Sequence, residues 1–159
     1  MIKAGDKIPS MTLKRLGQNG MEDVSTDEIF KGKVVLFAVP GAFTPTCSMK
    51  HLPGFVAKAD AFRAKGVDRV VCMAVNDPFV MKAWGEQNKV DGKVVMLPDG
   101  NGTFTKALGL EMDGTGYGLG SRSQRFALYA ENGIVKDVQV EKPGGFEVST
   151  AESMLERVR

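Results

Sequence analysis

Two uninterrupted apolar runs constrain the fold of this chain more than any other feature of the sequence. Residues 34–39 are Val-Val-Leu-Phe-Ala-Val, and residues 70–75 are Val-Val-Cys-Met-Ala-Val. Runs without the alternation of a half-exposed strand are typical of strands that are buried on both faces of a sheet. A Pro-Gly pair ends the first run, and Asn-Asp-Pro follows the second. We therefore expect two central strands, each followed by a helix.

The spacing of apolar residues predicts both helices. Between residues 52 and 62 apolar side chains recur at steps of three and four, and Gly66 supplies a stop signal. In the second helix Asp77 is the expected cap and Pro78 the first helical residue. The core-facing residues of this helix are predicted to be Val80, Met81 and Trp84.

Weaker patterns predict the remaining elements. They are strands at residues 8–13 and 94–97, and helices that begin after Ser25, at Asn101 and at Thr150. Residues 125–129 and 134–140 flank an Asn-Gly pair, which is a strong signal for an antiparallel hairpin. The order βαβαβα followed by ββα predicts an α/β, thioredoxin-like fold with a central mixed sheet flanked by helices. We expect residues 1–159 to form a single domain.

Composition and charge exclude several classes of partner. The chain has 43% hydrophobic and 25% charged residues, as in an ordinary globular protein. The 21 basic residues are interspersed with 19 acidic ones, so no stripe for nucleic acid is visible. The apolar runs are far shorter than the roughly 20 residues that cross a bilayer. We expect no nucleic acid or membrane partner and, because residues 1–6 lack a secretory h-region, a cytoplasmic protein.

Cys47 lies at the predicted crossing from the first central strand to its helix, where α/β sheets place reactive groups. If Thr44 caps the helix and Pro45 begins it, the cysteine lies in the first turn, where free N–H groups favour a thiolate. One exposed helix end supplies only about 0.3 to 1 kcal/mol, so strong activation needs a cation as well. Arg122 and Arg125 are the candidates, and the alternatives are a solvated arginine pair and a cysteine that only packs.

His51 follows Cys47 by four residues, so a Cys/His nucleophile pair of a hydrolase is one interpretation. No third orienting residue is evident, and a structural histidine is the favoured alternative. Pro53 should bend or break the helix, and the weakened turn suggests the hypothesis that it unwinds after oxidation.

In the favoured interpretation, neither Cys72 nor the glycine-rich residues 114–120 have a catalytic role. Cys72 lies inside the second apolar run, where packing is the favoured role and that of a resolving thiol the alternative. Two cysteines are too few for a disulfide framework or a four-cysteine zinc site, and no convincing metal cluster is present. Residues 114–120 lack the spacing of a phosphate cradle and are interpreted as a flexible loop.

Several motifs in the same order resemble those of one family. Pro40, Thr44 and Cys47 match the pattern Pro-x-x-x-Thr-x-x-Cys, and residues 51–55, 75–80 and 121–126 match the same subgroup. Over nearly its whole length the chain resembles the atypical type II, peroxiredoxin-5-like, peroxiredoxins.

The resemblance implies a site and a reaction. Cys47 would be the peroxidatic cysteine, and the hydroxyl of Thr44 would bond to peroxide and sulfur. Pro40 would shield the pocket, and Arg125 would hold the thiolate and the developing charge. The implied reaction is the thiol-dependent reduction of hydrogen peroxide and alkyl hydroperoxides through a Cys47 sulfenic acid, without metal or organic cofactor. On this interpretation Cys47→Ser abolishes activity and His51→Ala retains most of it.

The chain departs from family members that carry a resolving cysteine near the C-terminus, because residues 144–150 contain none. The resemblance therefore implies an external thiol reductant, with glutathione and glutaredoxin preferred and thioredoxin as the alternative. It also implies a non-covalent homodimer. The alternative function is that of a peroxide-sensing redox interaction protein without efficient turnover.

Overall fold

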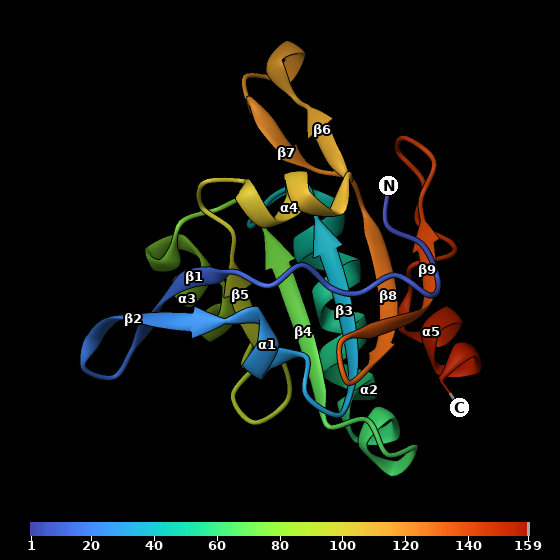
Figure 1. Ribbon diagram of the computed structural model, residues 1–159. Helices are drawn as coiled ribbons and strands as arrows, with labels where there is room; N and C mark the ends of the chain where they lie inside the picture. Colours follow the sequence, from blue (N-terminus) through green and yellow to red (C-terminus); the bar gives the residue numbers. More distant parts are fainter. Residues whose placement is uncertain (159) are drawn as a thin grey trace.

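The two apolar runs form the centre of a five-stranded mixed sheet (Figure 1). The structure, a computed structural model, describes residues 1–158, so Arg159 of the predicted domain lies outside the described residues. The strands lie in the order β5 (Val95–Pro98), β4 (Arg69–Ala74), β3 (Lys33–Val39), β8 (Phe126–Glu131) and β9 (Ile134–Val140). Strands β3, β4 and β5 run parallel to one another. Strand β8 runs antiparallel to β3, and β9 runs antiparallel to β8. The predicted central strands and hairpin are confirmed to within a residue or two.

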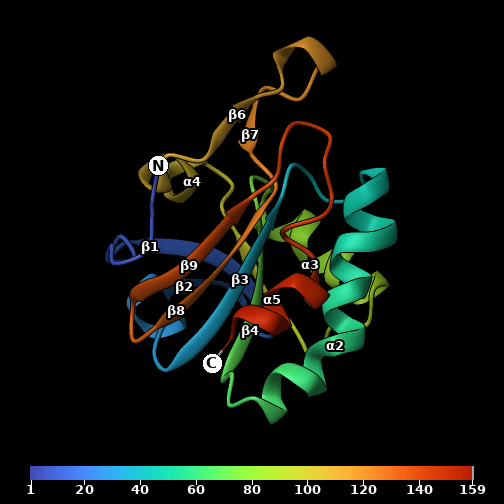
Figure 2. The ribbon, with the colours of Figure 1, turned by 90° about the vertical axis from the view of Figure 1, so that its right-hand side faces the viewer.

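Helices cover both faces of this sheet (Figure 2). On one face lie α2 (Leu52–Ala64), α3 (Pro78–Gln87) and α5 (Ala151–Arg157), and on the other lie α1 (Thr26–Ile29) and α4 (Thr103–Leu108). Within β3, Phe37 faces the first layer and Leu36 faces the second, and both are fully buried. Burial on both faces explains why the run is apolar throughout and confirms the thioredoxin-like fold.

The predicted helix starts are largely confirmed. The carboxylate of Asp77 accepts from the N–H of Val80, and the hydroxyl of Thr150 accepts from the N–H of Ser153. Ser25 precedes α1 but forms no side-chain cap. The buried residues of α3 are Met81, Trp84 and Gly85, whereas Val80 is half-buried, so the predicted core face was wrong at that position.

The strand predicted at residues 8–13 was wrong. The chain instead forms a hairpin of β1 (Thr12–Gly17) and β2 (Gly20–Ser25). Ile8 is held elsewhere, because its N–H donates to the carbonyl of Gly133 in the β8–β9 turn. The two-residue loop of this hairpin is Gln18 and Asn19, and Gly20 begins β2, so the loop is not the Asn-Gly loop that signals a tight hairpin.

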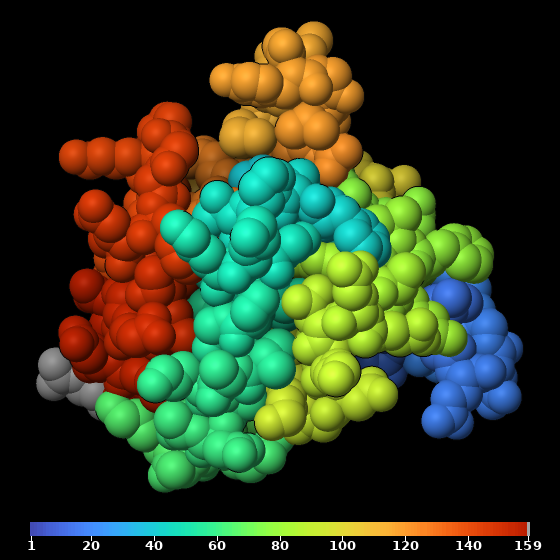
Figure 3. All heavy atoms as spheres, turned by 180° about the vertical axis from the view of Figure 1, so that it is seen from behind, coloured from blue at the N-terminus to red at the C-terminus, as the bar shows by residue number. Residues whose placement is uncertain are grey.

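The glycine-rich segment, interpreted from the sequence as a flexible loop, forms the tip of a second hairpin. Strands β6 (Glu111–Asp113) and β7 (Ser121–Ser123) pair on either side of it, and the hairpin projects from the body (Figure 3). Gly118 and Gly120 have φ angles of 73° and 68°, which only glycine adopts readily, and they turn the chain back. No helix among residues 1–158 has the length and apolarity needed to span a bilayer.

Candidate active site

The segment after β3 forms a helical turn of unusual width. The helix begins at Pro45, as predicted, and continues as a π-helix, η1 (Cys47–His51), directly into α2. The N–H of Leu52 donates to the carbonyl of Cys47, a step of five residues instead of four. Pro53 therefore does not break the helix, so of the two predicted effects, a bend or a break, the break is wrong. The proline follows the π-turn at once, and it has no N–H to strengthen that turn.

Cys47 is fully buried within this turn and lies beside an arginine. Nη2 of Arg125 donates to Sγ of Cys47 over 2.9 Å. The contact arises because Arg125 immediately precedes β8, which pairs with β3, so the arginine lies at the edge of the sheet where β3 ends. A guanidinium that donates to sulfur favours the thiolate. The predicted cation is thus Arg125, and its interpretation as a solvated residue was wrong.

His51 is buried, and both of its ring nitrogens are engaged. Nε2 lies 2.8 Å from the carbonyl oxygen of Ser149, which only accepts, so Nε2 carries the hydrogen. Nδ1 then accepts from Nη1 of Arg125, also over 2.8 Å. Burial, followed by the charge of Arg125, lowers the pKa of His51 from 6.5 to about 3. The ring is therefore neutral, and neither nitrogen is available to take a proton from Cys47.

This geometry favours the structural histidine over the Cys/His nucleophile pair. It also adds a contact that sequence reasoning missed, because His51 is the partner of Arg125. The four-residue spacing from Cys47 was the available signal, since it places both side chains on one helical face.

Thr44 and Pro40 both lie close to this site. The hydroxyl of Thr44 donates to the carbonyl of Gly41 over 2.7 Å rather than to sulfur, so its lone pairs remain for accepting. Pro40 and Arg125 line a pocket of about 390 Å³. A Cβ on Gly41 would lie 2.8 Å from Nη1 of Arg122, which approaches the carbonyl of Pro40 at 3.4 Å, so glycine permits this close approach.

Neighbouring side chains hold the turn in place. The indole N–H of Trp84 donates to the hydroxyl of Ser48 over 2.9 Å, and the amide oxygen of Asn76 accepts from the N–H of Ala42. Phe43, which follows Ala42 in the chain, has a φ of 64°, a left-handed conformation that is strained for an aromatic residue. Its ring is half-exposed and lies 6.4 Å from the ring of Trp84, centroid to centroid. Sequence reasoning identified none of these contacts.

Cys72 is fully buried in β4, opposite Phe37 of β3. Burial raises the pKa of the Cys72 thiol, and the nearby Cys47 raises it further. Both cysteines are free, and the packing prediction for Cys72 agrees with its position. Within residues 1–158 no group of three histidine, cysteine or acidic side chains is placed to hold a metal ion.

The buried cysteine accepts a hydrogen bond from an arginine and lies at the strand-to-helix crossing of a thioredoxin-like sheet. This arrangement defines a thiol enzyme of the thioredoxin-fold class. Comparison with known proteins narrows this class. A profile of the Redoxin family matches residues 3–155. Peroxiredoxin-2D of Arabidopsis thaliana is 49% identical over 156 residues, which cover 97% of this chain and 96% of the relative.

Solved structures agree with that comparison. Reduced Prx3 of Vibrio vulnificus in complex with hydrogen peroxide is 52% identical, with a TM-score of 0.95 and full coverage of both chains. Peroxiredoxin 5 of Alvinella pompejana is 33% identical, with a TM-score of 0.87 and coverage of 99% and 98%. The chain therefore belongs to the Redoxin family and, within it, to the type II, peroxiredoxin-5-like peroxiredoxins. The predicted function is confirmed at this level, as thiol-dependent reduction of peroxides.

Proposed function

We propose that Cys47 is the peroxidatic nucleophile. Its thiolate attacks the terminal oxygen of a hydroperoxide, the O–O bond breaks, and water or an alcohol leaves once protonated. Cys47 gains the oxygen and becomes a sulfenic acid, while the peroxide is reduced. The observation that carries this proposal is the 2.9 Å contact from Arg125 to the buried sulfur, with His51 turned to other partners.

Three further residues complete the proposed site. Arg125 holds the thiolate and stabilises the negative charge that spreads over the peroxide oxygens. Thr44 accepts the hydrogen of the peroxide through its free lone pairs, because its own hydrogen is bound to Gly41. Pro40, in the wall of the 390 Å³ pocket, shields the reacting atoms from water. Hydrogen peroxide and alkyl hydroperoxides are the proposed substrates.

An external thiol returns Cys47 to its reduced state. The chain has only two cysteines, and burial holds Cys72 as a neutral thiol, which is a weak nucleophile. We favour glutathione with glutaredoxin as the reductant over thioredoxin. Turnover of hydrogen peroxide with each purified system decides between them, and rapid turnover with thioredoxin alone would overturn this preference.

A non-covalent homodimer in the cytoplasm is the proposed working form. Phe43 and Met49 in the active-site turn and Phe79 at the start of α3 are 50%, 76% and 60% exposed, and a partner copy would cover such apolar side chains. A reducing compartment suits a cycle that consumes thiols. Sedimentation equilibrium of the reduced protein tests the dimer, and a monomer at micromolar concentration contradicts it.

Intact mass after one equivalent of hydrogen peroxide tests the central proposal. The expected product carries one additional oxygen on Cys47 that a sulfenic-acid trap captures. Loss of two hydrogens would instead identify a disulfide with Cys72. An unchanged mass contradicts the proposal, and oxidation without subsequent turnover by any thiol would indicate a sensor.

A further inference from the structure

Glu141 is a buried carboxylate that the proposed chemistry does not use. The residue is only 8% exposed, and its Oε2 accepts three hydrogen bonds. They come from the backbone N–H groups of Glu147 and Ser149, each over 2.8 Å, and from the hydroxyl of Ser149 over 2.7 Å. Bonds to a charged acceptor in a buried setting are strong, so this side chain fixes the shape of the 142–149 loop.

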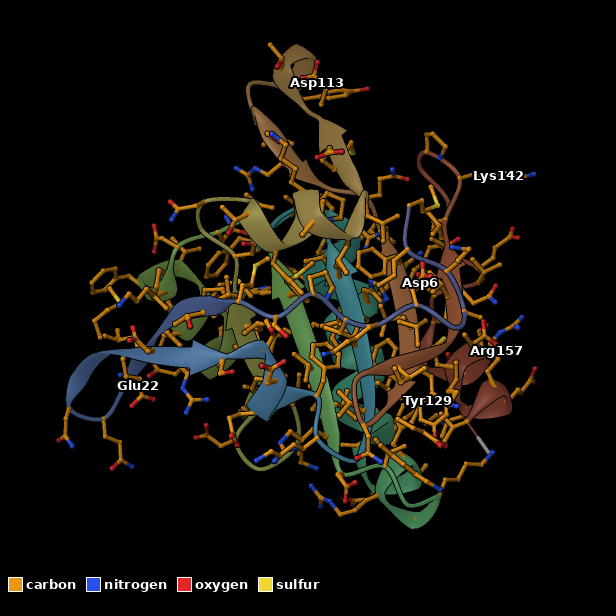
Figure 4. The ribbon with its side chains drawn as sticks, viewed as in Figure 1. Asp6, Glu22, Asp113, Tyr129, Lys142 and Arg157 are labelled. Atoms are coloured by element: carbon orange, nitrogen blue, oxygen red, sulfur yellow. The ribbon has the colours of Figure 1, made fainter. Side chains whose placement is uncertain are left out.

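The 142–149 loop in turn holds the pair formed by Arg125 and His51. The carbonyl of Ser149 accepts from Nε2 of His51. The ring of Phe146 meets the imidazole edge-on, with centroids 5.2 Å apart, and lies 5.9 Å from the guanidinium carbon. Figure 2 shows the loop, between β9 and α5, beside the start of the helix that carries the site. Lys142 points away from the body into solvent (Figure 4), so it does not tether the loop.

Glu141 also reaches Arg125 through the main chain. Its backbone N–H donates to the carbonyl of Arg125 over 2.9 Å, next to the pairing of Phe126 with Val140. Glu141 thus fixes the backbone of Arg125 through its own N–H. Through its side chain it fixes the 142–149 loop, which holds His51, the partner of Arg125.

We propose that Glu141 is a positioning residue for the peroxidase site. Glu141 holds Ser149 in place by accepting its N–H and its hydroxyl. The carbonyl of Ser149 then accepts from Nε2 of His51 and so keeps the hydrogen on that nitrogen. The lone pair on Nδ1 then orients Arg125, whose other terminal nitrogen stays on the sulfur of Cys47. The inference rests on the proposed function, because it assigns Glu141 a task only if Arg125 activates Cys47.

Three variants separate positioning from general support of the fold. Glu141→Ala removes the acceptor of all three hydrogen bonds. Glu141→Gln keeps an oxygen in its place without the charge. Glu152→Gln makes the same chemical change at an exposed carboxylate in the first turn of α5 and serves as the control.

Two measurements report on the site itself. The first is the second-order rate constant for sulfenic acid formation after rapid mixing with hydrogen peroxide, in the absence of any reductant. The second is the ¹⁵N spectrum of the imidazole, which distinguishes the two tautomers. Because the chain has one histidine, its signals need no assignment.

For Glu141→Ala we expect a rate constant about threefold to tenfold lower, the same range as for removal of His51, and a mixture of imidazole tautomers. For Glu141→Gln we expect a rate constant within about twofold of the wild type and the Nε2–H tautomer alone. Glu152→Gln should match the wild type. A folded Glu141→Ala protein with unchanged rate constant and tautomer overturns the proposal, as does a Glu141→Gln protein as impaired as Glu141→Ala.

If Glu141→Ala does not fold, Glu141→Asp replaces it, because the shorter side chain withdraws the oxygen from its donors and keeps the charge. The same two losses are expected, and their absence contradicts the proposal. Failure of the proposed function is distinguishable, since the wild type would then form no trappable sulfenic acid on Cys47.

Discussion

The hydrogen bond from Nη1 of Arg125 to Nδ1 of His51, 2.8 Å long, exists only while the imidazole is neutral. A protonated ring would turn an N–H toward a guanidinium N–H and bring two positive charges together. The opposite ring nitrogen already donates to Ser149, so the ring cannot rotate to avoid this conflict without losing that bond. His51 is therefore a fixed acceptor for the arginine.

Stability should fall below neutral pH because of His51. Its pKa is 6.5 when unfolded and about 3 when folded, so the unfolded chain takes up the proton first as the pH falls. The contribution is complete above about pH 6.5 and is lost progressively toward pH 3. Between pH 7 and 5.5 the expected loss is about 1 kcal/mol in the free energy of unfolding.

Urea unfolding at both pH values measures this loss. His51 is the only histidine, so a folded His51→Gln variant should show a much smaller change over the same interval. An identical change in the variant would assign the effect to other groups.

Arg125→Ala should slow the reaction of the reduced protein with hydrogen peroxide by roughly 10- to 100-fold. A hydrogen bond from a charged group contributes about 1.5 to 3 kcal/mol, and this one is made to the reacting sulfur. Arg125→Lys should recover only part of the rate, because one ammonium cannot reproduce the two-pronged contact with Cys47 and His51. Stopped-flow oxidation measures both variants, with the inactive Cys47→Ser protein as the baseline.

His51→Ala should slow the same reaction by about threefold to tenfold, which is more than the sequence alone suggested. The variant loses one neutral hydrogen bond to Arg125, of about 0.5 to 1.5 kcal/mol, but leaves the contact of the arginine with sulfur in place. The order of rate constants wild type, His51→Ala, Arg125→Ala is the expected result. A His51→Ala protein as slow as Cys47→Ser would support a base role for the histidine.

Oxidation should loosen the π-turn. The hydrogen bond that closes the turn spans five residues instead of four, and the proline after the turn donates none, so loss of the contact between arginine and sulfur removes one of the few side-chain contacts that hold the turn. Hydrogen exchange of residues 48–52 should be faster in the oxidised form than in the reduced one. Equal protection in the two forms would count against unwinding.

Cys72→Ala should retain peroxide turnover with an external thiol. The side chain is buried on the sheet, and the neutral thiol takes no step in the proposed cycle. The truncation should lower the free energy of unfolding by about 1 kcal/mol through lost packing. Loss of turnover with unchanged stability would instead make Cys72 a resolving residue.

Patterns among residues close in sequence predicted much of this fold. Residues 34–39 are apolar because both faces of β3 are covered, and the turn at Asn132 and Gly133 adopts the left-handed φ angles of 49° and 81° that its residue types favour. The two short hairpins escaped prediction. Three-residue strands such as β6 and β7 have too few positions to show a period, and the β1–β2 loop, Gln18 and Asn19, lacks the Asn-Gly signal.

The site was predictable where it depends on neighbours in sequence. The position of Cys47 follows from the strand and helix around it, and the demand for a cation follows from the weakness of one helix end. The choice of Arg125 over Arg122 depends on the register of β8 against β3, which no local pattern reveals. The contact between His51 and Ser149 joins segments 98 residues apart, so only the folded chain brings them together.

Complete burial of the Cys47 sulfur has a consequence for the order of events in the cycle. No water-sized group reaches this sulfur until the turn opens, and a hydroperoxide, whose terminal O–H is about the size of a water molecule, needs only a small opening on the side of the pocket beside Arg125. Oxidised glutathione carries its two sulfurs between a pair of tripeptides, and this bulk prevents them from aligning with a sulfur that has no exposed surface. In the proposed cycle the reduced sulfur is thereby protected from mixed-disulfide formation, and the oxidising half-reaction precedes the thiol half-reaction on steric grounds.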